Sequence, residues 1–320
     1  MRTSPLHETL ARSAALQSCR PRFPAFLAIF LAFVSAAHAV SPKLNSISPA
    51  GGQRGTELDM SFNGARLDDA REIVFHTTGI ELVKLEPAKT NLLKARVRIA
   101  PDCRLGEHLI RVRTASGVSD LRSFFVGAFT NITEIEPNSD IAKAQKIPLN
   151  VTVNGKTGQE DVDFYQIEAR AGQRISAEVE AIRLGRSILD SYVAIRDASG
   201  AVLAASDDTA LLMQDSALSF TASKAGTYLI EVREASYSGT ADSAYRLHVG
   251  TFPRPMAVYP AGGKVGGTVK VKFIGAEGGD FEQEIKLPAT PQEKFAVFAA
   301  RSPGFSRPDV EAVNNAANSS

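Results

Sequence analysis

The chain has 320 residues, of which 44% are hydrophobic and 22% are charged, and its formal net charge is +1. A balance this close to neutral argues against nucleic acid or an anionic membrane surface as the main partner, because binding to either depends on an excess of basic residues. The length exceeds that of one small β-sandwich and suits two or three domains.

Residues 1–39 have the order of a secretory signal peptide. A basic segment with four arginines precedes the apolar run PAFLAIFLAFVSAA and the small-x-small sequence Ala37-His38-Ala39. The apolar run is shorter than the roughly 20 residues that span a bilayer. We therefore predict cleavage before Val40, export without membrane insertion, and a periplasmic, cell-surface or extracellular location. Cleavage removes four arginines and one glutamate, which leaves a net charge of −2.

Two stretches of the chain match each other without a gap. The first is PAGGQRGTELDMSFNGA at 49–65, the second is PAGGKVGGTVKVKFIGA at 260–276, and eight of the 17 aligned residues are identical. This self-similarity indicates duplication of a structural unit. Each copy reads as a turn followed by a strand, with Leu58, Met60 and Phe62 on one buried face in the first copy.

The first copy continues into several more short apolar strands, and we predict an antiparallel sandwich over residues 40–128. The sequences PAGGQRGTELDMSFNGARL and GEHLIRVRTASGVSDLRSFFV resemble the immunoglobulin-like (Ig-like) fold of plexins and transcription factors, known as IPT or TIG. Cys103, the only thiol left after cleavage, is expected to be a small buried residue rather than a reactive or intermolecular thiol.

The segment 129–251 has the clearest period-two pattern of the chain. In RISAEVEA, Ile175, Ala177, Val179 and Ala181 share one face, and the polar residues between them share the other. The strands around Tyr228 and Tyr245 repeat this pattern, which predicts that Glu231, Arg233, Arg246 and His248 face outward. We predict a jelly-roll-like sandwich of about eight strands.

Four separated motifs of this middle segment resemble the bacterial pre-peptidase C-terminal domain: EIEPNSDIAKAQKIPLNVTVNG, EDVDFYQIEARAGQRI, AGTYLIEVREA and SAYRLHV. The resemblance implies a non-catalytic appendage of a secreted protein, often of a peptidase. It also implies calcium ligands in the first two motifs, because the related collagen-binding domains of clostridial collagenases bind calcium at their N-terminal edge.

The residues of EIEPNSD themselves also indicate a cation site. Glu134, Glu136 and Asn138 stand at i, i+2 and i+4 of an extended segment, so their side chains face one side. Asp161 and Asp163 precede the next strand with the same spacing, and the five oxygen-bearing side chains suit calcium, which takes 6 to 8 oxygen ligands. The alternative is a solvated edge with Asn138 in an Asx turn and Asp140 capping a short turn.

A second acidic group follows the strand that ends near Ala204. Asp207, Asp208 and Asp215 either hold another ion or form a polar turn that keeps a strand edge from pairing with other chains, and the polar turn is favoured.

The last segment, 252–320, contains the second copy of the repeat but is too short for a complete sandwich. We predict a partial Ig-like unit with a disordered tail. The expected fold is therefore all-β, with tandem antiparallel sandwiches that are Ig-like, jelly-roll-like and partial Ig-like in turn.

No catalytic motif marks the chain as an enzyme: nucleophile elbow, zinc helix, P-loop and dinucleotide fingerprint are missing from the sequence. The expected function is a secreted non-catalytic protein that binds or presents extracellular protein or polysaccharide, with calcium bracing the domain junction. The alternative is the accessory region of a larger secreted peptidase or other hydrolase. The sequence leaves the ligand and the oligomeric state open.

Overall fold

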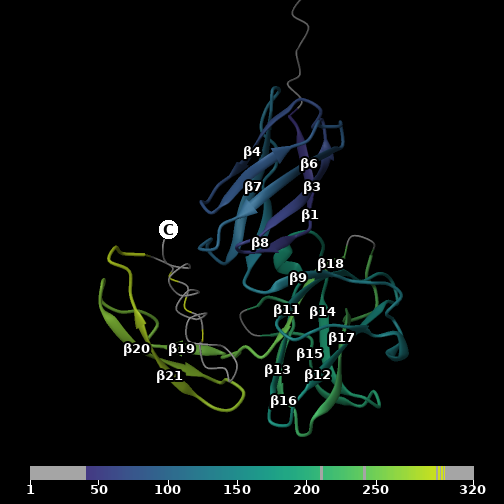
Figure 1. The fold of residues 1–320 in the computed structure, drawn as a ribbon, viewed down its shortest axis with the longest axis vertical. Helices are drawn as coiled ribbons and strands as arrows, with labels where there is room; N and C mark the ends of the chain where they lie inside the picture. The colour runs from purple at the N-terminus through teal and green to yellow at the C-terminus, as the bar shows by residue number, and fades with distance from the viewer. Residues whose placement is uncertain are drawn as a thin grey trace, which may run out of the picture. The chain divides into compact units, whose positions relative to one another are not determined.

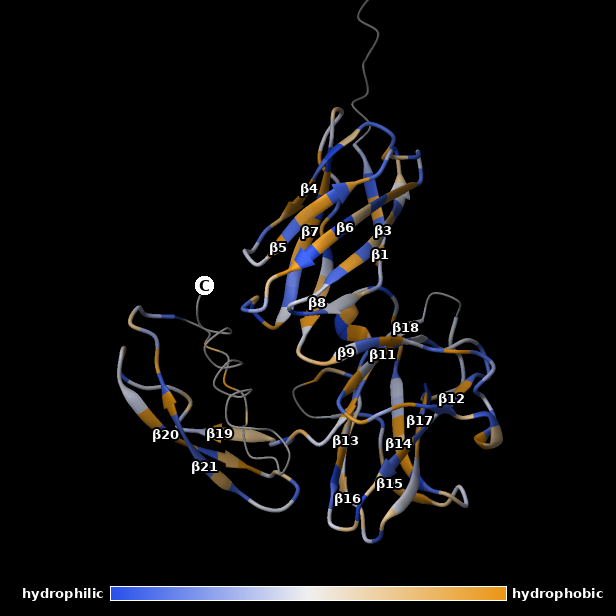
Figure 2. Ribbon diagram, viewed as in Figure 1, coloured by the Kyte–Doolittle hydropathy of each residue, from blue (hydrophilic) through white to orange (hydrophobic). Residues whose placement is uncertain are grey.

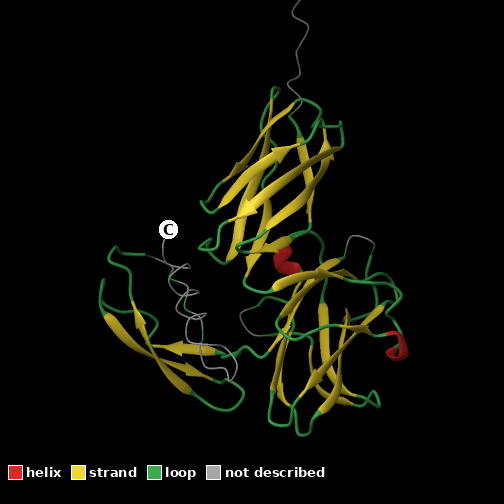
Figure 3. Ribbon diagram, in the orientation of Figure 1, coloured by secondary structure: helices red, strands yellow, loops and turns green. Residues whose placement is uncertain are grey.

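A computed structural model describes residues 41–209, 212–240 and 243–292, together with Phe295, Val297 and Ala299. The predicted signal peptide and the predicted tail lie outside these residues. Strands make up nearly all of the regular structure (Figure 3), and the described helical turns are the 3-10 turns η1 (Ile141–Lys143) and η2 (Ile182–Leu184). The predicted all-β class of tandem sandwiches is confirmed. No helix among the described residues is long and apolar enough to cross a membrane.

The first sandwich consists of two four-stranded sheets (Figure 1). One sheet has the order β1 (Lys43–Ser48), β3 (Glu57–Ala65), β6 (Leu92–Ile99) and β5 (Ile80–Leu85). The other has the order β2 (Gly51–Gln53), β8 (Arg122–Gly127), β7 (Gly106–Thr114) and β4 (Ala70–Phe75). All pairs are antiparallel except β2 with β8.

The predicted buried face of this sandwich is largely confirmed. Met60 and Phe62 are at most 1% exposed, and they pack in one cluster with core residues of both sheets. Cys103 lies in the same cluster, as predicted, and burial raises the pKa of its thiol to about 11. A thiol that is buried and protonated at neutral pH is a poor nucleophile.

The middle sandwich has ten strands among the described residues, two more than the eight predicted. One sheet has the order β10 (Gln145–Lys146), β12 (Val162–Ala169), β17 (Gly226–Glu234), β14 (Ser191–Asp197) and β15 (Val202–Ser206). The other has the order β16 (Ala217–Thr221), β13 (Arg174–Glu180), β18 (Ala244–Gly250), β11 (Val151–Lys156) and β9 (Thr130–Thr133). The edge pairs β9 with β11 and β10 with β12 are parallel, and the others are antiparallel.

The core of the middle sandwich follows the period-two pattern, which Figure 2 shows as alternating hydropathy along the strands. Ile175, Ala177, Val179 and Ala181 are all fully buried. The prediction that Glu231, Arg233, Arg246 and His248 face outward is wrong in part, because Arg246 is 1% and Glu231 is 3% exposed. Both carry ion pairs that offset the cost of burying their charges: Glu231 pairs with Arg196 and Arg246 pairs with Glu180 at 2.7 Å.

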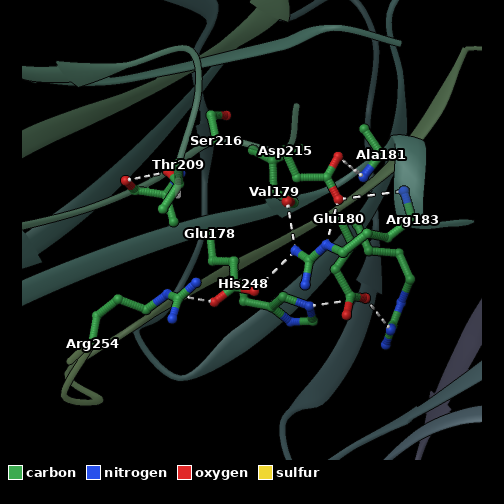
Figure 4. Close-up of polar contacts among 12 residues, drawn as sticks. Glu178, Val179, Glu180, Ala181, Arg183, Thr209, Asp215, Ser216, His248 and Arg254 are labelled. Atoms are coloured by element: carbon green, nitrogen blue, oxygen red, sulfur yellow. Dashed lines mark hydrogen bonds and ion pairs between the residues drawn. The ribbon is translucent and has the colours of Figure 1, made fainter. Parts of the chain in front are cut away.

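An ionic network covers the outer side of β13 and β18 (Figure 4). Arg183 pairs with Glu178 at 3.0 Å and with Asp215 at 2.5 Å. Asp215 is fully buried and accepts hydrogen bonds from the backbone N–H groups of Ala181 and Ile182, at 2.9 and 2.8 Å. The carboxylate of Asp215 therefore stabilises the start of η2 through these hydrogen bonds.

Asp207 and Asp208 do not share the environment of Asp215. Both are exposed at the end of β15, and Asp207 Oδ1 accepts a hydrogen bond from the backbone N–H of Asp208. The polar-turn interpretation fits these two residues but not Asp215, and the three do not form one ion site.

The third unit repeats the first strand pair of the first sandwich with the same register. Its sheet has the order β19 (Ala257–Tyr259), β20 (Thr268–Ile274) and β21 (Phe281–Lys286). Val258 pairs with Phe273 as Ile47 pairs with Phe62 at the equivalent positions of the first copy. Both copies have a cis peptide bond before the repeated proline, Pro49 or Pro260.

The two copies differ after that strand pair. By sequence position β21 corresponds to β4, which pairs with β7 in the opposite sheet. In the third unit β21 pairs instead with β20, in the place that β6 takes beside β3. The pairing covers a β20 edge that would otherwise expose a row of backbone hydrogen-bonding groups.

The network around Arg183 gives a stability prediction. Replacing Asp215 by Asn removes the negative charge that pairs with the guanidinium of Arg183. It also replaces one carboxylate oxygen, an acceptor, by an NH₂ donor that faces backbone N–H groups. We expect Asp215→Asn to lower the free energy of unfolding by about 3 kcal/mol, as for other broken buried pairs. Urea unfolding followed by circular dichroism measures it. Asp207→Asn, at an exposed turn, is the control and is expected to change little; equal midpoints for both variants would contradict the prediction.

Candidate metal centre

The segment that follows β9 crosses from one sheet of the middle sandwich to the other. At its start, the backbone N–H of Glu134 donates to the carbonyl of Asn154 on β11, at 3.1 Å. At its end, the carbonyl of Asn138 accepts from the backbone N–H of Phe164 on β12, at 3.1 Å. The crossing segment, residues 134–138, is thus fixed to one sheet at each end.

Asp163 lies at the point where this segment reaches β12. Side chains alternate along a strand, so Asp163 has the same orientation as Tyr165 and Ile167, which face the core. Its side chain is fully buried. The spacing of Asp161 and Asp163 predicts both as ligands beside residues 134–138, but it does not predict that the carboxylate of Asp163 enters the sandwich.

Three carboxylates meet at this position. One oxygen each of Glu134, Glu136 and Asp163 lies within 4.8 Å of the others. Asn138 joins them: its side chain is fully buried, and its amide Nδ2 donates to Glu134 Oε1 at 3.3 Å. Four of the five predicted ligands are therefore brought together.

Asp161, the fifth predicted ligand, has other partners. Its two carboxylate oxygens accept from the hydroxyl of Ser139 and from the backbone N–H of Gly158, both at 3.0 Å. These bonds close the turn before β12 and tie it to Ser139, which directly follows the crossing segment. Asp140 caps η1 by accepting from the N–H of Ala142, as the alternative interpretation predicts for that residue.

Two buried oxygens of the cluster have no hydrogen-bond partner among the residues that the structure describes. They are Asn138 Oδ1 and Asp163 Oδ1. A buried acceptor without a partner costs free energy, and such atoms are uncommon in folded proteins. Both oxygens belong to residues beside the three carboxylates, and oxygen atoms are the ligands that hard cations take. The residues present therefore fit a bound hard cation.

The electrostatics of the cluster support the same conclusion. Burial and the neighbouring charge of Glu134 raise the pKa of Asp163 to about 9. Burial and the charges of Asp161 and Glu134 also raise the pKa of Glu136. Among the described residues, no basic side chain forms an ion pair with Glu134, Glu136 or Asp163. Either a proton or a cation is needed to balance these charges.

Two tyrosines lie beneath the carboxylates and were not predicted as site residues. The hydroxyl of Tyr165 donates to Glu134 at 2.9 Å, and that of Tyr245 donates to Asp163 at 2.6 Å. The period-two pattern predicts both rings in the core, which is correct. It carries no information on where a hydroxyl at the end of a buried ring points, so sequence spacing gave no signal for this contact.

Comparisons with known proteins find similarity to parts of this chain. The family model of the bacterial pre-peptidase C-terminal domain matches residues 161–234. A probable subtilase-type serine protease of Deinococcus radiodurans is 32% identical over 171 residues, which are 42% of this chain and 22% of that protein. The chain thus spans about a fifth of this relative's length.

Two solved structures are similar at low sequence identity. The pre-peptidase C-terminal domain of a collagenase from Bacillus anthracis has a TM-score of 0.28 and 19% identity, covering 36% of this chain and 99% of that one. PliG of Aeromonas hydrophila, a periplasmic lysozyme inhibitor, has a TM-score of 0.26 and 16% identity, covering 33% and 96%. The family match by itself places the similarity to the bacterial pre-peptidase C-terminal domain within the middle sandwich, at residues 161–234.

Proposed function

We propose that this protein is a secreted, non-catalytic multidomain β-protein that binds or presents extracellular protein or polysaccharide, and that calcium braces its middle sandwich. The pre-peptidase C-terminal domain and the signal-peptide pattern of residues 1–39 support the first part. The cation site supports the second. The single observation that carries it is the pair of buried, unpartnered oxygens of Asn138 and Asp163 beside three carboxylates.

Calcium suits this donor set better than magnesium does. Glu134, Glu136, Asn138 and Asp163 offer oxygen atoms from one irregular segment and one strand, and calcium tolerates irregular geometry whereas magnesium demands a near-ideal octahedron. Backbone carbonyls and water would complete the 6 to 8 ligands. Asp161 remains a predicted fifth ligand, which its own variant tests.

The ion would act mechanically. It would hold the crossing segment, which is paired with β11 on one side, to Asp163 of β12 in the opposite sheet. The sequence predicts a calcium site at the junction between domains. Glu134, Glu136, Asn138 and Asp163 instead lie in the N-terminal part of the middle sandwich. At a hundredfold excess over its Kd, such an ion adds about 2.7 kcal/mol to stability.

A second candidate function is the accessory region of a larger secreted peptidase or other hydrolase. The match to a subtilase-type serine protease of Deinococcus radiodurans favours it, since that match covers only part of the relative. Both functions require binding without catalysis by the described sandwiches.

Cosedimentation tests the binding that both functions share. We expect the purified protein to pellet with insoluble polysaccharide or with insoluble protein fibres, and calcium to increase the bound fraction. Bovine serum albumin serves as the control for trapping. Protein that stays in the supernatant with every polymer would contradict the binding function and leave the cation site unaffected.

Calcium is expected to raise the melting temperature of the middle sandwich, because it binds the folded state through groups that separate on unfolding. Scanning calorimetry of the purified protein, with calcium or with chelator, measures the shift. Asp163→Asn and Glu136→Gln are expected to abolish it.

The controls for this experiment separate ligands from bystanders. Asp208→Asn removes an exposed acid outside the cluster and should retain the full shift. Asp161→Asn loses the shift if Asp161 is a ligand and keeps it if that residue only closes the turn. An unaltered protein that melts at the same temperature with millimolar calcium and with chelator would refute the cation site.

The raised pKa of Asp163 predicts a pH dependence in the absence of cations. In the unfolded chain an Asp titrates near pH 4, while in the folded protein Asp163 keeps its proton up to about pH 9. Between these values the folded state binds one more proton, so this residue makes stability fall as pH rises.

Urea unfolding in chelator across this pH range measures the effect. The unaltered protein should lose stability with rising pH relative to Asp163→Asn, which cannot titrate. Saturating calcium should remove the difference in slope, because the ion keeps the ionised carboxylate balanced. Parallel pH profiles of the two proteins in chelator would be inconsistent with a protonated Asp163.

A further inference from the structure

Two tyrosines from opposite sheets of the middle sandwich meet below the carboxylates of the crossing segment. Tyr165 is on β12 and Tyr245 is on β18, and their hydroxyl oxygens are 2.5 Å apart. Both side chains are almost completely buried, at 0% and 1% exposure. They join the core of the sandwich to the candidate metal centre.

The two hydroxyls contact each other and the carboxylates. Tyr165 donates to Glu134 Oε1 at 2.9 Å. Tyr245 lies 2.6 Å from Asp163 Oδ2 and 3.1 Å from Glu134 Oε1. The other oxygen of Asp163, Oδ1, is the unpartnered one. The tyrosines thus hold one oxygen of Asp163 and leave the other free.

Both carboxylate oxygens of Glu134 are also held by hydrogen bonds. Its Oε2 accepts from the backbone N–H of Lys156 at 2.9 Å, while Oε1 faces the two hydroxyls. Glu134 lies directly after the edge strand β9 and Asp163 lies on β12, so the tyrosine pair spans the distance between the two sheets.

Gly155 on β11 makes room for this arrangement. It pairs in register with Tyr245 across the β11–β18 ladder. A Cβ atom at position 155 would lie 2.5 Å from Cζ of the Tyr245 ring and 2.6 Å from its hydroxyl oxygen, which is closer than real Cβ contacts come. The sandwich therefore omits a side chain where the ring passes.

We propose that Tyr165 and Tyr245 are positioning residues of the cation site: their hydroxyls orient Glu134 and Asp163 so that the free carboxylate oxygens face the ion. This inference rests on the proposed calcium site. Groups that hold metal ligands in place from behind commonly change metal affinity by ten- to a hundredfold when they are removed.

The same core contains a matched control. Tyr228 is also buried, at 3% exposure, but its hydroxyl donates to the backbone carbonyl of Lys224 at 2.9 Å. Among the described hydrogen bonds, this hydroxyl makes none with the carboxylates of the cluster. Tyr228→Phe deletes one buried hydroxyl of the same sandwich, as Tyr165→Phe and Tyr245→Phe do. A purely structural role of a tyrosine hydroxyl would affect all three variants alike.

Isothermal titration with calcium tests the proposal on the purified protein. We expect Tyr165→Phe and Tyr245→Phe each to weaken calcium binding by about ten- to a hundredfold and Tyr228→Phe to leave it unchanged. Gly155→Ala should weaken binding while both hydroxyls are still present, because it displaces the Tyr245 ring. Far-UV circular dichroism confirms that each variant is folded.

Terbium luminescence supplies a second readout, which begins with the unaltered protein. The chain has no Trp, so light absorbed by nearby aromatic rings must reach a bound Tb³⁺ from tyrosine or phenylalanine. We expect the unaltered protein to sensitise Tb³⁺ emission with the excitation spectrum of tyrosine, and calcium to displace the ion. The double variant Tyr165→Phe/Tyr245→Phe should lose this emission at saturating Tb³⁺, and Tyr228→Phe should keep it.

The outcomes distinguish a failure of the cation site from a failure of the positioning role. If the unaltered protein binds neither calcium nor Tb³⁺, the proposed cation site fails and the positioning role fails with it. If it binds both ions, but the two phenylalanine variants bind calcium as tightly as the unaltered protein does, only the positioning role is overturned. Emission without a tyrosine excitation spectrum would also overturn it.

Discussion

The stability of the middle sandwich depends on how the negative charge of the buried Asp163 carboxylate is compensated. A strand position that faces the core normally holds an apolar side chain, yet this one holds an acid that is fully buried and has Glu134 as a neighbour of like charge. An ionised pair without compensation is unfavourable in a medium of low polarity. The tyrosine hydroxyls satisfy part of the hydrogen bonding but bring no positive charge. A proton or a cation has to supply it.

Elsewhere in the same sandwich, basic side chains compensate the charges of buried acids. Glu180 is also desolvated, and burial alone would raise its pKa, but His248, Arg246 and Arg183 outweigh this effect and lower it to about 2. Asp215 is held by Arg183 and by backbone N–H groups in a comparable way. The negative charges of Glu180 and Asp215 are thus compensated by basic side chains and backbone N–H groups of the protein. At Asp163 the chain supplies oxygen donors and no basic side chain among the described residues, which is the composition of a site for an external cation.

The crossing segment explains why such a site would matter to the fold. It leaves one sheet at β9 and joins the other beside β12, and each end is held by backbone hydrogen bonds. An ion bound at the proposed site would contact groups attached to both sheets, so its binding would be coupled to the pairing of this edge of the sandwich. The pre-peptidase C-terminal match begins at residue 161 and covers the strand with Asp163 but not the crossing segment. The candidate metal centre therefore combines a strand inside the matched region with a segment that precedes it in the chain.

The sequence alone determined the class of the fold, the repeated strand pair and the residues of the main cores, because period-two alternation and turn residues are local properties. It also brought Glu134, Glu136, Asn138 and Asp163 into one hypothesis. Only the tertiary structure decided that Asp161 has other partners, that Asp215 lies apart from Asp207, and that Arg246 and Glu231 are buried. Alternation shows which side chains share a face of a strand, but what covers that face depends on strand order and on loops that return from elsewhere in the chain. The tyrosine hydroxyls depend on both sheets at once, and the distance between sheets is not encoded in the spacing of residues along either strand.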